Sequence, residues 1–320
     1  MVYNPVNDSI YASVESIGPL AHTVTTINPH TGAIEASAAV GYYPGHLALS
    51  DDGQFLYVAI DGSGLITRFN IAAAVPDLSF PAGVDKYDGT LFAGDIQVLP
   101  GNPHAIAVSR RFDPRTSPPF QGVAIFDDGT PRPNVTSHLS SPATNVIRFA
   151  GSPSVLYGLD TEDTGAYFVT LSVDESGCAY KNSTSIFSDG RIPSDYITRI
   201  DIVDGLMYTI FGQVYDPVAM MLATPFSPGC IGGGCGCVVP DPQAGKVFFL
   251  TGDAAGRDVL EIFDQHTFAQ VGSIAIPDIY FSDTFTTVCL RYGEKGFAFA
   301  ATERLPENAR EDYVVLMELP

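Results

Sequence analysis

Short runs of alternating apolar and polar or small residues follow one another along the whole chain, separated by Gly, Pro, Asp, Asn and Ser. Between positions 44 and 64, the run His46-Leu-Ala-Leu-Ser50 is followed by an Asp-Asp-Gly turn and by Phe55-Leu-Tyr-Val-Ala-Ile60. A period of two is typical of β-strands, and an Asp-Gly turn between two such runs is typical of a β-hairpin. The best helix candidate, positions 70–75, ends at Pro76 after barely a turn. The pattern therefore predicts an all-β protein.

The second run of this hairpin recurs along the chain. Seven copies begin at positions 10, 56, 105, 155, 206, 247 and 297, so that successive starts lie 46, 49, 50, 51, 41 and 50 residues apart. A turn precedes each copy, and a third strand-like run follows it. Four-stranded units with this period are typical of propeller blades, whereas a β-sandwich would place about seven strands in ~100 residues. We therefore expect a seven-bladed β-propeller of four-stranded antiparallel blades.

The period divides the chain into blades of one propeller domain that spans residues 1–320. The expected blades cover approximately 1–41, 42–90, 91–140, 141–190, 191–234, 235–280 and 281–320. In the short fifth blade we assign residues 218–222 to the third strand, which leaves little room for an outer strand. The sequence of the last blade ends after its third strand, so we expect it to lack a fourth strand within this chain. Either the ring closes on a three-stranded blade, or the chain is part of a longer polypeptide whose flanking residues complete the blade, which is the alternative we favour.

Several repeats resemble a known family. The segments YPGHLALSDDGQFLYVAIDGSGLITRFNI and INPHTGAIEASAAVG resemble the YVTN-type repeat of bacterial propellers, although Asp61 follows Ile60 where the commonest repeat has Asn. Further segments, including GKVFFLTG and IFDQHTFAQVGSIAIP, are similar to propellers of large secreted bacterial proteins with Ig-like or autotransporter-like architecture. The resemblance implies a seven-bladed propeller that is secreted or displayed on the cell surface. It implies no particular activity, because one fold hosts many functions.

Charge and hydropathy narrow the classes of partner. The formal net charge is −20 and only 16% of the residues are charged, so a nucleic acid would be repelled over most of the surface. No run approaches the ~18 consecutive apolar residues of a membrane-spanning helix. We therefore expect neither nucleic-acid binding nor a membrane span in this chain.

All five cysteines lie in the second half of the chain. Cys178 and Cys230 each follow a Gly after a strand-like run, which makes them the expected disulfide pair in an oxidising compartment, although spacing alone does not fix the pairing. The group at positions 230, 235 and 237 lacks C-x-x-C spacing and a nearby His, which disfavours zinc.

Ligand-handling residues of a propeller gather in the loops at one mouth of its channel. In this chain those loops carry carboxylates, arginines, tyrosines and one histidine, a set that suits a sugar, peptide or anion. The expected ligand-binding residues are Tyr43, His46, Asp61, Arg110, Arg111, Asp160, Glu162, Arg191, Tyr196 and Asp283.

Three features of this set bear on catalysis. His46 would serve as a general base, or would simply bond a backbone carbonyl; Arg110 and Arg111 would clamp an anion, or would balance nearby carboxylates. Asp160, Glu162 and Asp163 place three oxygen-rich side chains in one turn, which suits Ca²⁺ or Mg²⁺ but lacks the full EF-hand spacing. Apart from such a cation, no cofactor is expected.

Three functions fit the sequence. The first is an extracellular or cell-surface binding module whose partner is a protein, a glycan or a small polar ligand. The second is an enzyme of the propeller lactonase or lyase kind with a divalent cation, in which His46, Arg110, Arg111 and Glu162 are the catalytic candidates. The third is a structural spacer of a large adhesin. Nucleophile motifs such as G-x-S-x-G are absent from the sequence, so we expect a binding module rather than an enzyme.

Overall fold

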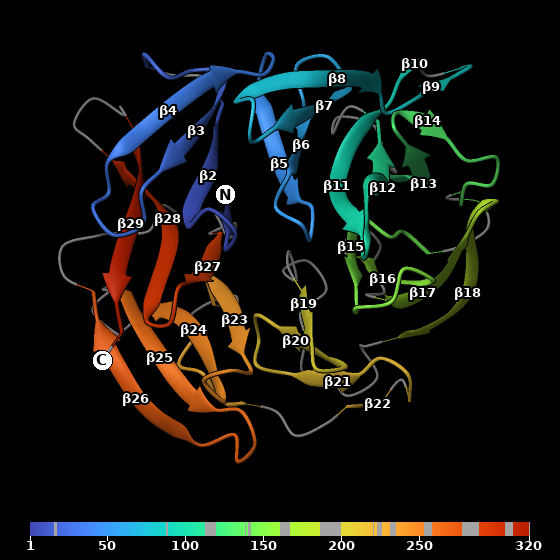
Figure 1. Ribbon diagram of the computed structural model, residues 1–320. Helices are drawn as coiled ribbons and strands as arrows, with labels where there is room; N and C mark the ends of the chain where they lie inside the picture. The colour runs from blue at the N-terminus through green and yellow to red at the C-terminus, as the bar shows by residue number, and fades with distance from the viewer. Residues whose placement is uncertain are drawn as a thin grey trace. The chain divides into compact units, whose positions relative to one another are not determined.

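The computed structural model describes residues 1–15, 18–87, 89–112, 120–137, 139, 142–160, 167–185, 200–219, 221–222, 226–230, 235–252, 258–276, 288–304 and 310–319. In these ranges every regular element is a β-strand (Figure 1). The described residues contain no helix that is long and apolar enough to cross a membrane. The chain forms two compact units, Met1–Ser188 and Asp189–Pro320. Each is described here by itself.

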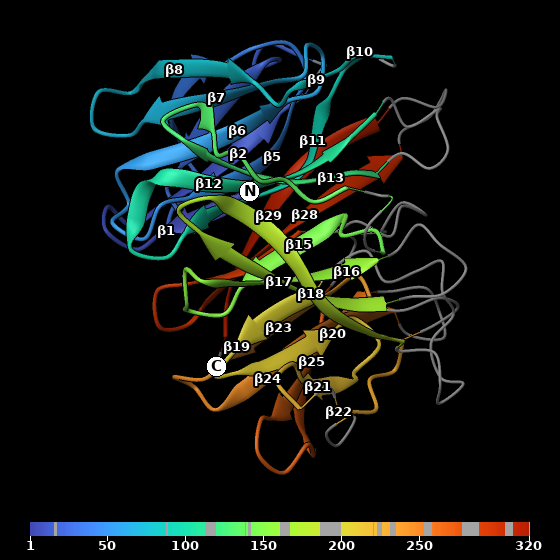
Figure 2. The same ribbon diagram turned by 90° about the vertical axis from the view of Figure 1, so that its right-hand side faces the viewer.

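Unit 1 contains four antiparallel sheets in which consecutive strands pair. The strands of the four sheets, in chain order, are β1 (Val2–Asn4), β2 (Ser9–Val14), β3 (Thr23–Ile27) and β4 (Ile34–Ala39); β5 (Pro44–Leu49), β6 (Phe55–Ile60), β7 (Leu65–Asn70) and β8 (Val75–Pro81); β11 (Phe92–Leu99), β12 (Asn102–Arg111), β13 (Phe120–Asp127) and β14 (Thr130–Pro131); and β15 (Val146–Phe149), β16 (Val155–Asp160), β17 (Tyr167–Asp174) and β18 (Gly177–Ser185). Figure 2 shows the last of these sheets, β15 to β18, from the side. A small hairpin of β9 (Val84–Asp85) and β10 (Gly89–Thr90) follows β8.

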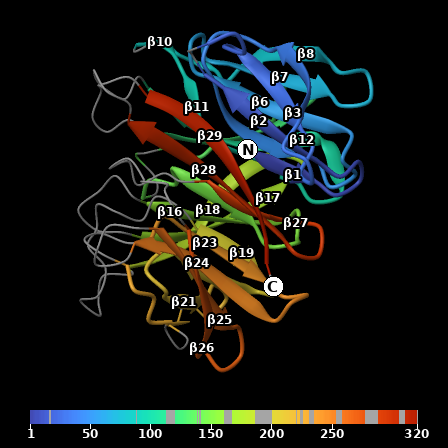
Figure 3. The same ribbon diagram turned by 90° about the vertical axis from the view of Figure 1, so that its left-hand side faces the viewer.

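Unit 2 contains three further sheets of the same kind. Their strands, in chain order, are β19 (Ile200–Val203), β20 (Leu206–Thr209), β21 (Val214–Asp216) and β22 (Met221–Leu222); β23 (Cys237–Asp241), β24 (Lys246–Gly252), β25 (Asp258–Asp264) and β26 (Gln270–Ala275); and β27 (Cys289–Tyr292), β28 (Gly296–Arg304) and β29 (Arg310–Glu318). Figure 3 shows the three strands β27 to β29 in red. Seven successive meanders confirm the predicted seven-bladed propeller fold, with a last blade of three strands among the described residues.

The sheets of unit 1 bury their apolar faces against one another. Tyr57 and Ile66 of the second sheet pack with Ile96 and Val108 of the third, all almost fully buried. A second cluster joins the third and fourth sheets, and a third cluster joins the first and second. Strand β6 lies between two such clusters, and all of its residues are buried. This face-to-face packing gives unit 1 two ends, each formed by loops.

We name these two ends by their loops. At the loop end, the inner strands β5, β11 and β15 begin and the second strands β6, β12 and β16 end; at the hairpin end, tight turns join the same pairs of strands. The Asp-Asp-Gly turn of the second sheet lies at the hairpin end. There Gly53 has φ = 68°, and its amide donates a hydrogen bond to the carbonyl of Ser50. Of the residues predicted from the sequence, Tyr43, His46, Asp61, Arg110, Arg111 and Asp160 lie at the loop end of unit 1.

Residues 71–74, within the short helix candidate, form a turn between β7 and β8, as the all-β prediction requires. One strand assignment differs from the structure. The assignment of residues 218–222 to the third strand of the fifth blade is wrong, because β21 is the third strand and β22 is a two-residue outer strand. The connection from β20 is a tight turn in which Thr209 bonds Gln213 and Gly212 has φ = 84°. The third strand therefore begins earlier than the repeat spacing suggests.

Candidate functional site at the loop end of unit 1

The entrance of β5 and the exit of β6 bring His46 and Asp61 to the same place. Pro44 pairs with Ile60, and the register is irregular from there to Leu47, which turns the first residues of β5 outward. Gly45 lies against this carboxylate, because a Cβ atom there would lie 2.8 Å from Oδ2 of Asp61 and would displace it. The absence of a side chain lets the Asp61 carboxylate lie against the backbone of β5.

Asp61 forms an ion pair with Arg111 at the loop end and has a shifted pKa. Nη2 of Arg111, at the end of β12, lies 3.5 Å from Oδ1 of Asp61. Burial raises the pKa of Asp61, while the charges of Arg111 and His46 act in the opposite direction without cancelling it. The side chains of Asp61 and Arg111 remain 33% and 25% exposed. Such a long, partly exposed ion pair leaves N–H donors on Arg111 and acceptor lone pairs on Asp61 that a ligand can bind.

A second carboxylate, that of the buried Asp95 on β11, lies behind His46. It is 6% exposed, and its oxygens accept hydrogen bonds from the Ile96 amide at 2.9 Å, from the Ile147 amide at 2.9 Å and from Nη1 of Arg148 at 2.7 Å. Nδ1 of the half-exposed His46 lies 3.8 Å from Oδ1 of Asp95. Asp95 therefore ties the inner strands β11 and β15 together and places a negative charge behind the His46 ring.

Three aromatic residues in mutual contact, His22, Tyr42 and Tyr43, form what we call the aromatic platform, and the backbone of Tyr42 and Tyr43 is hydrogen-bonded to that of Gly62 and Asp61. The ring centroids of Tyr42 and Tyr43 are 4.2 Å apart, and the His22 ring lies 4.5 Å from that of Tyr42 and 5.7 Å from that of Tyr43. The platform is exposed, since Tyr42 and Tyr43 keep 55% and 38% of their surface accessible. Contiguous exposed aromatic surface is uncommon on soluble proteins and marks interaction sites.

The backbone of the platform is held in an unfavourable conformation. His22 and Tyr43 have φ values of 65° and 57°, a region in which a bulky residue costs about 1–3 kcal/mol. Hydrogen bonds hold this arrangement: Nδ1 of His22 accepts from the Tyr43 amide at 3.3 Å, and the amides of Asp61 and Gly62 donate to the carbonyls of Tyr43 and Tyr42. Strain that the surroundings maintain is a sign of function rather than of folding alone.

Arg110 and Arg111 do not form a common clamp. Nη2 of Arg110 donates to the carbonyl of Gln121 at 3.2 Å, and its Nη1 lies against Gly83, away from Asp61. Burial lowers the pKa of Arg110, and its buried Nε has no hydrogen-bond partner among the described residues. Alternation along β12 explains the divergence, because consecutive residues of a strand point to opposite faces.

Asp160 is fully buried, and its Oδ2 accepts a hydrogen bond from the Ala143 amide at 3.2 Å. It thus anchors the segment before β15. Its predicted cation-binding partners, Glu162 and Asp163, lie outside the described residues, as do Arg191, Tyr196 and Asp283. Within the described ranges, no three His, Cys, Asp or Glu side chains are grouped as a metal would require. The cation site therefore stays a prediction.

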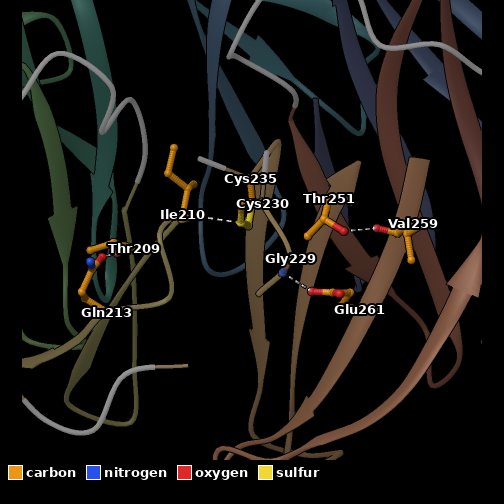
Figure 4. Close-up of a disulfide and its surroundings, with 9 residues drawn as sticks. All are labelled: Thr209, Ile210, Gln213, Gly229, Cys230, Cys235, Thr251, Val259 and Glu261. Carbon is orange, nitrogen blue, oxygen red and sulfur yellow. Dashed lines mark hydrogen bonds between the residues drawn. A yellow bond between two sulfur atoms is a disulfide. The ribbon is translucent and has the colours of Figure 1, made fainter. Parts of the chain in front are cut away.

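The predicted Cys178–Cys230 disulfide is wrong. Cys230 is bonded to Cys235, with Cα atoms 4.9 Å apart (Figure 4). Cys237 is bonded to Cys289, with Cα atoms 6.1 Å apart. Cys178 is a free thiol, 2% exposed, packed in the core between the third and fourth sheets, where burial raises its pKa to about 12. Similar sequence settings did not fix the pairing, because Cys178 points into a core while Cys230 lies in a loop.

The first disulfide closes a loop between the fifth and sixth sheets. Figure 4 shows Cys230 near the Ile210 carbonyl, and the Gly229 amide donates to Oε2 of Glu261 on β25 at 2.8 Å. The second disulfide joins the inner strands β23 and β27 directly. Both bridges lie within unit 2.

Sequence reasoning missed His22, Asp95 and Arg148. The signal for Asp95 was present, since it is a single carboxylate in the otherwise uncharged strand β11. His22 carried no signal, because its place beside the tyrosines depends on the turn after β2. A cavity of about 420 Å³ was also not predicted; it lies at the hairpin end, between the inner strands, lined by Leu47, Leu49, Gln97, Val98 and Phe149 among others.

Comparison with known proteins supports the fold alone. No protein-family model and no curated protein sequence matches the chain. Among solved structures, the β-propeller domain of Cps50 (Swd1) from Myceliophteria thermophila is 14% identical with a TM-score of 0.68, covering 100% of this chain and 96% of its own. Kuenenia stuttgartiensis hydrazine synthase is 12% identical with a TM-score of 0.67, covering 99% and 94%. A putative 6-phosphogluconolactonase from Bacteroides fragilis is 12% identical with a TM-score of 0.58, covering 98% and 96%. The chain is similar to β-propellers over essentially its whole length.

Proposed function

We propose that the protein is an extracellular or cell-surface binding module whose ligand site is the loop end of unit 1. The observation that carries this proposal is the partly exposed Asp61–Arg111 pair at 3.5 Å. The charge of His46 acts on Asp61, and backbone hydrogen bonds join Asp61 and Gly62 to the aromatic platform. Binding sites combine apolar or aromatic surface with a few polar groups that fix orientation. Here both kinds of group meet within a few residues.

Two observations support the location. Disulfides persist mainly in oxidising compartments, and unit 2 contains two. The YVTN-type resemblance of the repeats adds a bacterial, secreted or surface-displayed origin to the proposal. The partner is a glycan, a protein or a small polar ligand.

An enzyme of the lactonase kind is the second candidate. The exposed imidazole of His46 lies near the carboxylates of Asp61 and Asp95, an arrangement suited to a general base. The similarity to a putative 6-phosphogluconolactonase also favours this candidate. Incubation of the full chain with a panel of lactones, with and without Ca²⁺ or Mg²⁺, separates the two proposals. A binding module turns over none of them faster than its His46→Ala variant, whereas turnover that His46→Ala abolishes would establish the enzyme.

The binding proposal is tested by ligand-observed NMR on the full chain with mixed panels of oligosaccharides, short peptides and small polar metabolites. We expect at least one compound to give a signal that Arg111→Ala removes and that Arg132→Ala leaves unchanged. Arg132 is a suitable control because it also pairs with an aspartate, Asp127, but on the outer strands of the third sheet. Binding that is equally strong in both variants would place the ligand elsewhere.

A further inference from the structure

The charges of the loop end restrict the chemistry of a ligand that contacts them. The guanidinium of Arg111 and the carboxylate of Asp61 lie 3.5 Å apart, so any group that contacts one lies within reach of the other. An anion would meet the Asp61 carboxylate, and a cation would meet Arg111. A neutral ligand that carries both donors and acceptors, such as a ring with several hydroxyl groups, can bond both without repulsion.

The aromatic platform restricts the shape of the ligand. Tyr42 and Tyr43 contact each other at 4.2 Å between centroids, and His22 fills the next position at 4.5 Å from Tyr42. Rings in mutual contact leave no gap between them for a quaternary ammonium group, which an aromatic cage would need. What they offer is their outer surface, on which a ring with an apolar face can stack.

We infer that the ligand is a neutral glycan, with one pyranose ring stacked on Tyr42 or Tyr43 and its hydroxyl groups bonded to Asp61, Arg111 and His46. The inference rests on the binding function proposed above and names its ligand class. A pyranose presents C–H bonds on its faces and hydroxyl groups at its edge, which matches an aromatic surface bordered by one carboxylate, one guanidinium and one imidazole.

The platform is preorganised for such a contact. The Asp61 and Gly62 amides hold the carbonyls of Tyr43 and Tyr42 at 2.9 and 3.0 Å, and a Cβ atom at Gly62 would lie 2.4 Å from the Tyr42 carbonyl oxygen. Gly62 therefore permits an approach that any other residue would block. Fixing the rings before binding reduces the entropy lost when a ligand is captured.

The test is affinity gel electrophoresis of the full chain in gels that contain one neutral polysaccharide each: barley β-glucan, xyloglucan, galactomannan or mannan. We expect at least one polysaccharide to retard the protein, and Tyr42→Ala and Tyr43→Gly to weaken that retardation by about tenfold or more in Kd. Tyr180→Ala is the matched control, because Tyr180 is also exposed, at 39%, but lies on the outer strand β18. Circular dichroism and the melting temperature of each variant show that it is folded.

Retardation that persists in both platform variants, or that is absent with every polysaccharide, overturns the glycan inference. The same variants are then tested with the peptides and metabolites of the NMR panel. A non-glycan signal that Arg111→Ala removes would leave the proposed binding function intact with another ligand class. If no compound of any class is sensitive to the loop-end variants, the proposed function falls as well.

Discussion

The backbone amide of Asp61 donates a hydrogen bond to the carbonyl oxygen of Tyr43 at 2.9 Å. This one bond joins the exit of β6 to the residue before β5 begins, and thereby links the ionised groups of the loop end to the aromatic platform. The conformation of Tyr43, with φ = 57°, determines where both the ring and the carbonyl point. The two halves of the proposed site are therefore held as one structure.

Replacing Asp95 should destabilise the protein. In Asp95→Asn, one of the acceptor oxygens used by Ile96, Ile147 and Arg148 becomes an amide donor, and Arg148 loses its counter-charge. Breaking a buried charge pair on one side costs about 3–5 kcal/mol, and partial exposure of Arg148 places this site at the lower end. Urea unfolding measures the loss. Asp8→Asn is the control, since Asp8 pairs with His30 on the surface, and it should change stability by less than about 1 kcal/mol. Equal effects of the two variants would contradict the assigned role of Asp95.

Replacing Asp61 should have the opposite effect on stability. Burial raises the pKa of Asp61 above its usual value of 3.8, so the native state binds more protons than the unfolded state between these two pKa values. By linkage, the contribution of Asp61 to stability falls as pH rises through that window. Asp61→Asn lacks this titration. We therefore expect the unfolding free energy of the wild type, relative to Asp61→Asn, to decrease from pH 3 to pH 7. A relative increase would show that the pair with Arg111 outweighs burial.

Two substitutions at Tyr43 separate backbone strain from the role of the ring. Gly adopts positive φ readily, whereas a β-branched residue is a clear outlier there. Tyr43→Gly should unfold at a temperature close to that of the wild type, and Tyr43→Val should be less stable than Tyr43→Gly by about 1–2 kcal/mol. Thermal unfolding followed by circular dichroism compares them. If the Val variant is as stable as the Gly variant, the backbone at position 43 does not hold the strained conformation in solution.

The two disulfides should differ in their effect on unit 2. Loop closure predicts about 4 kcal/mol for the bridge between Cys237 and Cys289, which spans 52 residues, and about 2 kcal/mol for the bridge between Cys230 and Cys235. Replacing both cysteines of the longer bridge by Ala should therefore lower stability more than the same change in the shorter one.

Non-reducing peptide mapping tests the disulfide pairing directly. It should show both bridges and should show Cys178 alkylated only after unfolding, whereas rapid labelling of native Cys178 would contradict its burial.

The architecture could be predicted from the sequence because it depends on repeated local patterns. The apolar run of β6 and the turn before it recur along the chain at similar spacing, so an error in one copy does not alter the predicted fold. The strand assignment failed in the fifth blade, where the tight turn at Gly212 shortens the connection after β20. A period averaged over seven blades contains no information about such a local change.

Loop position predicted which residues share the loop end of unit 1, and the binding site itself stays a proposal. His46, Asp61 and Arg111 converge because β5, β6 and β12 all have their ends at one side of unit 1. Arg110 has other partners than Arg111, because neighbouring residues of a strand face opposite ways. His22 and the disulfide partners depend on how loops fold back on the sheets, which no periodicity records.

The most direct measurement of the central claim is residue-resolved NMR of the full, deuterated chain titrated with the compound that binds best in the panels. If the loop end is the site, the amide resonances of Tyr43, His46, Asp61 and Gly62 shift on binding, while those of Asp51 and Gly53 at the hairpin end stay unchanged. Shifts confined to Asp51, Gln97 and Gly151, which line the hairpin-end cavity, would contradict the proposal and assign the ligand to the opposite end.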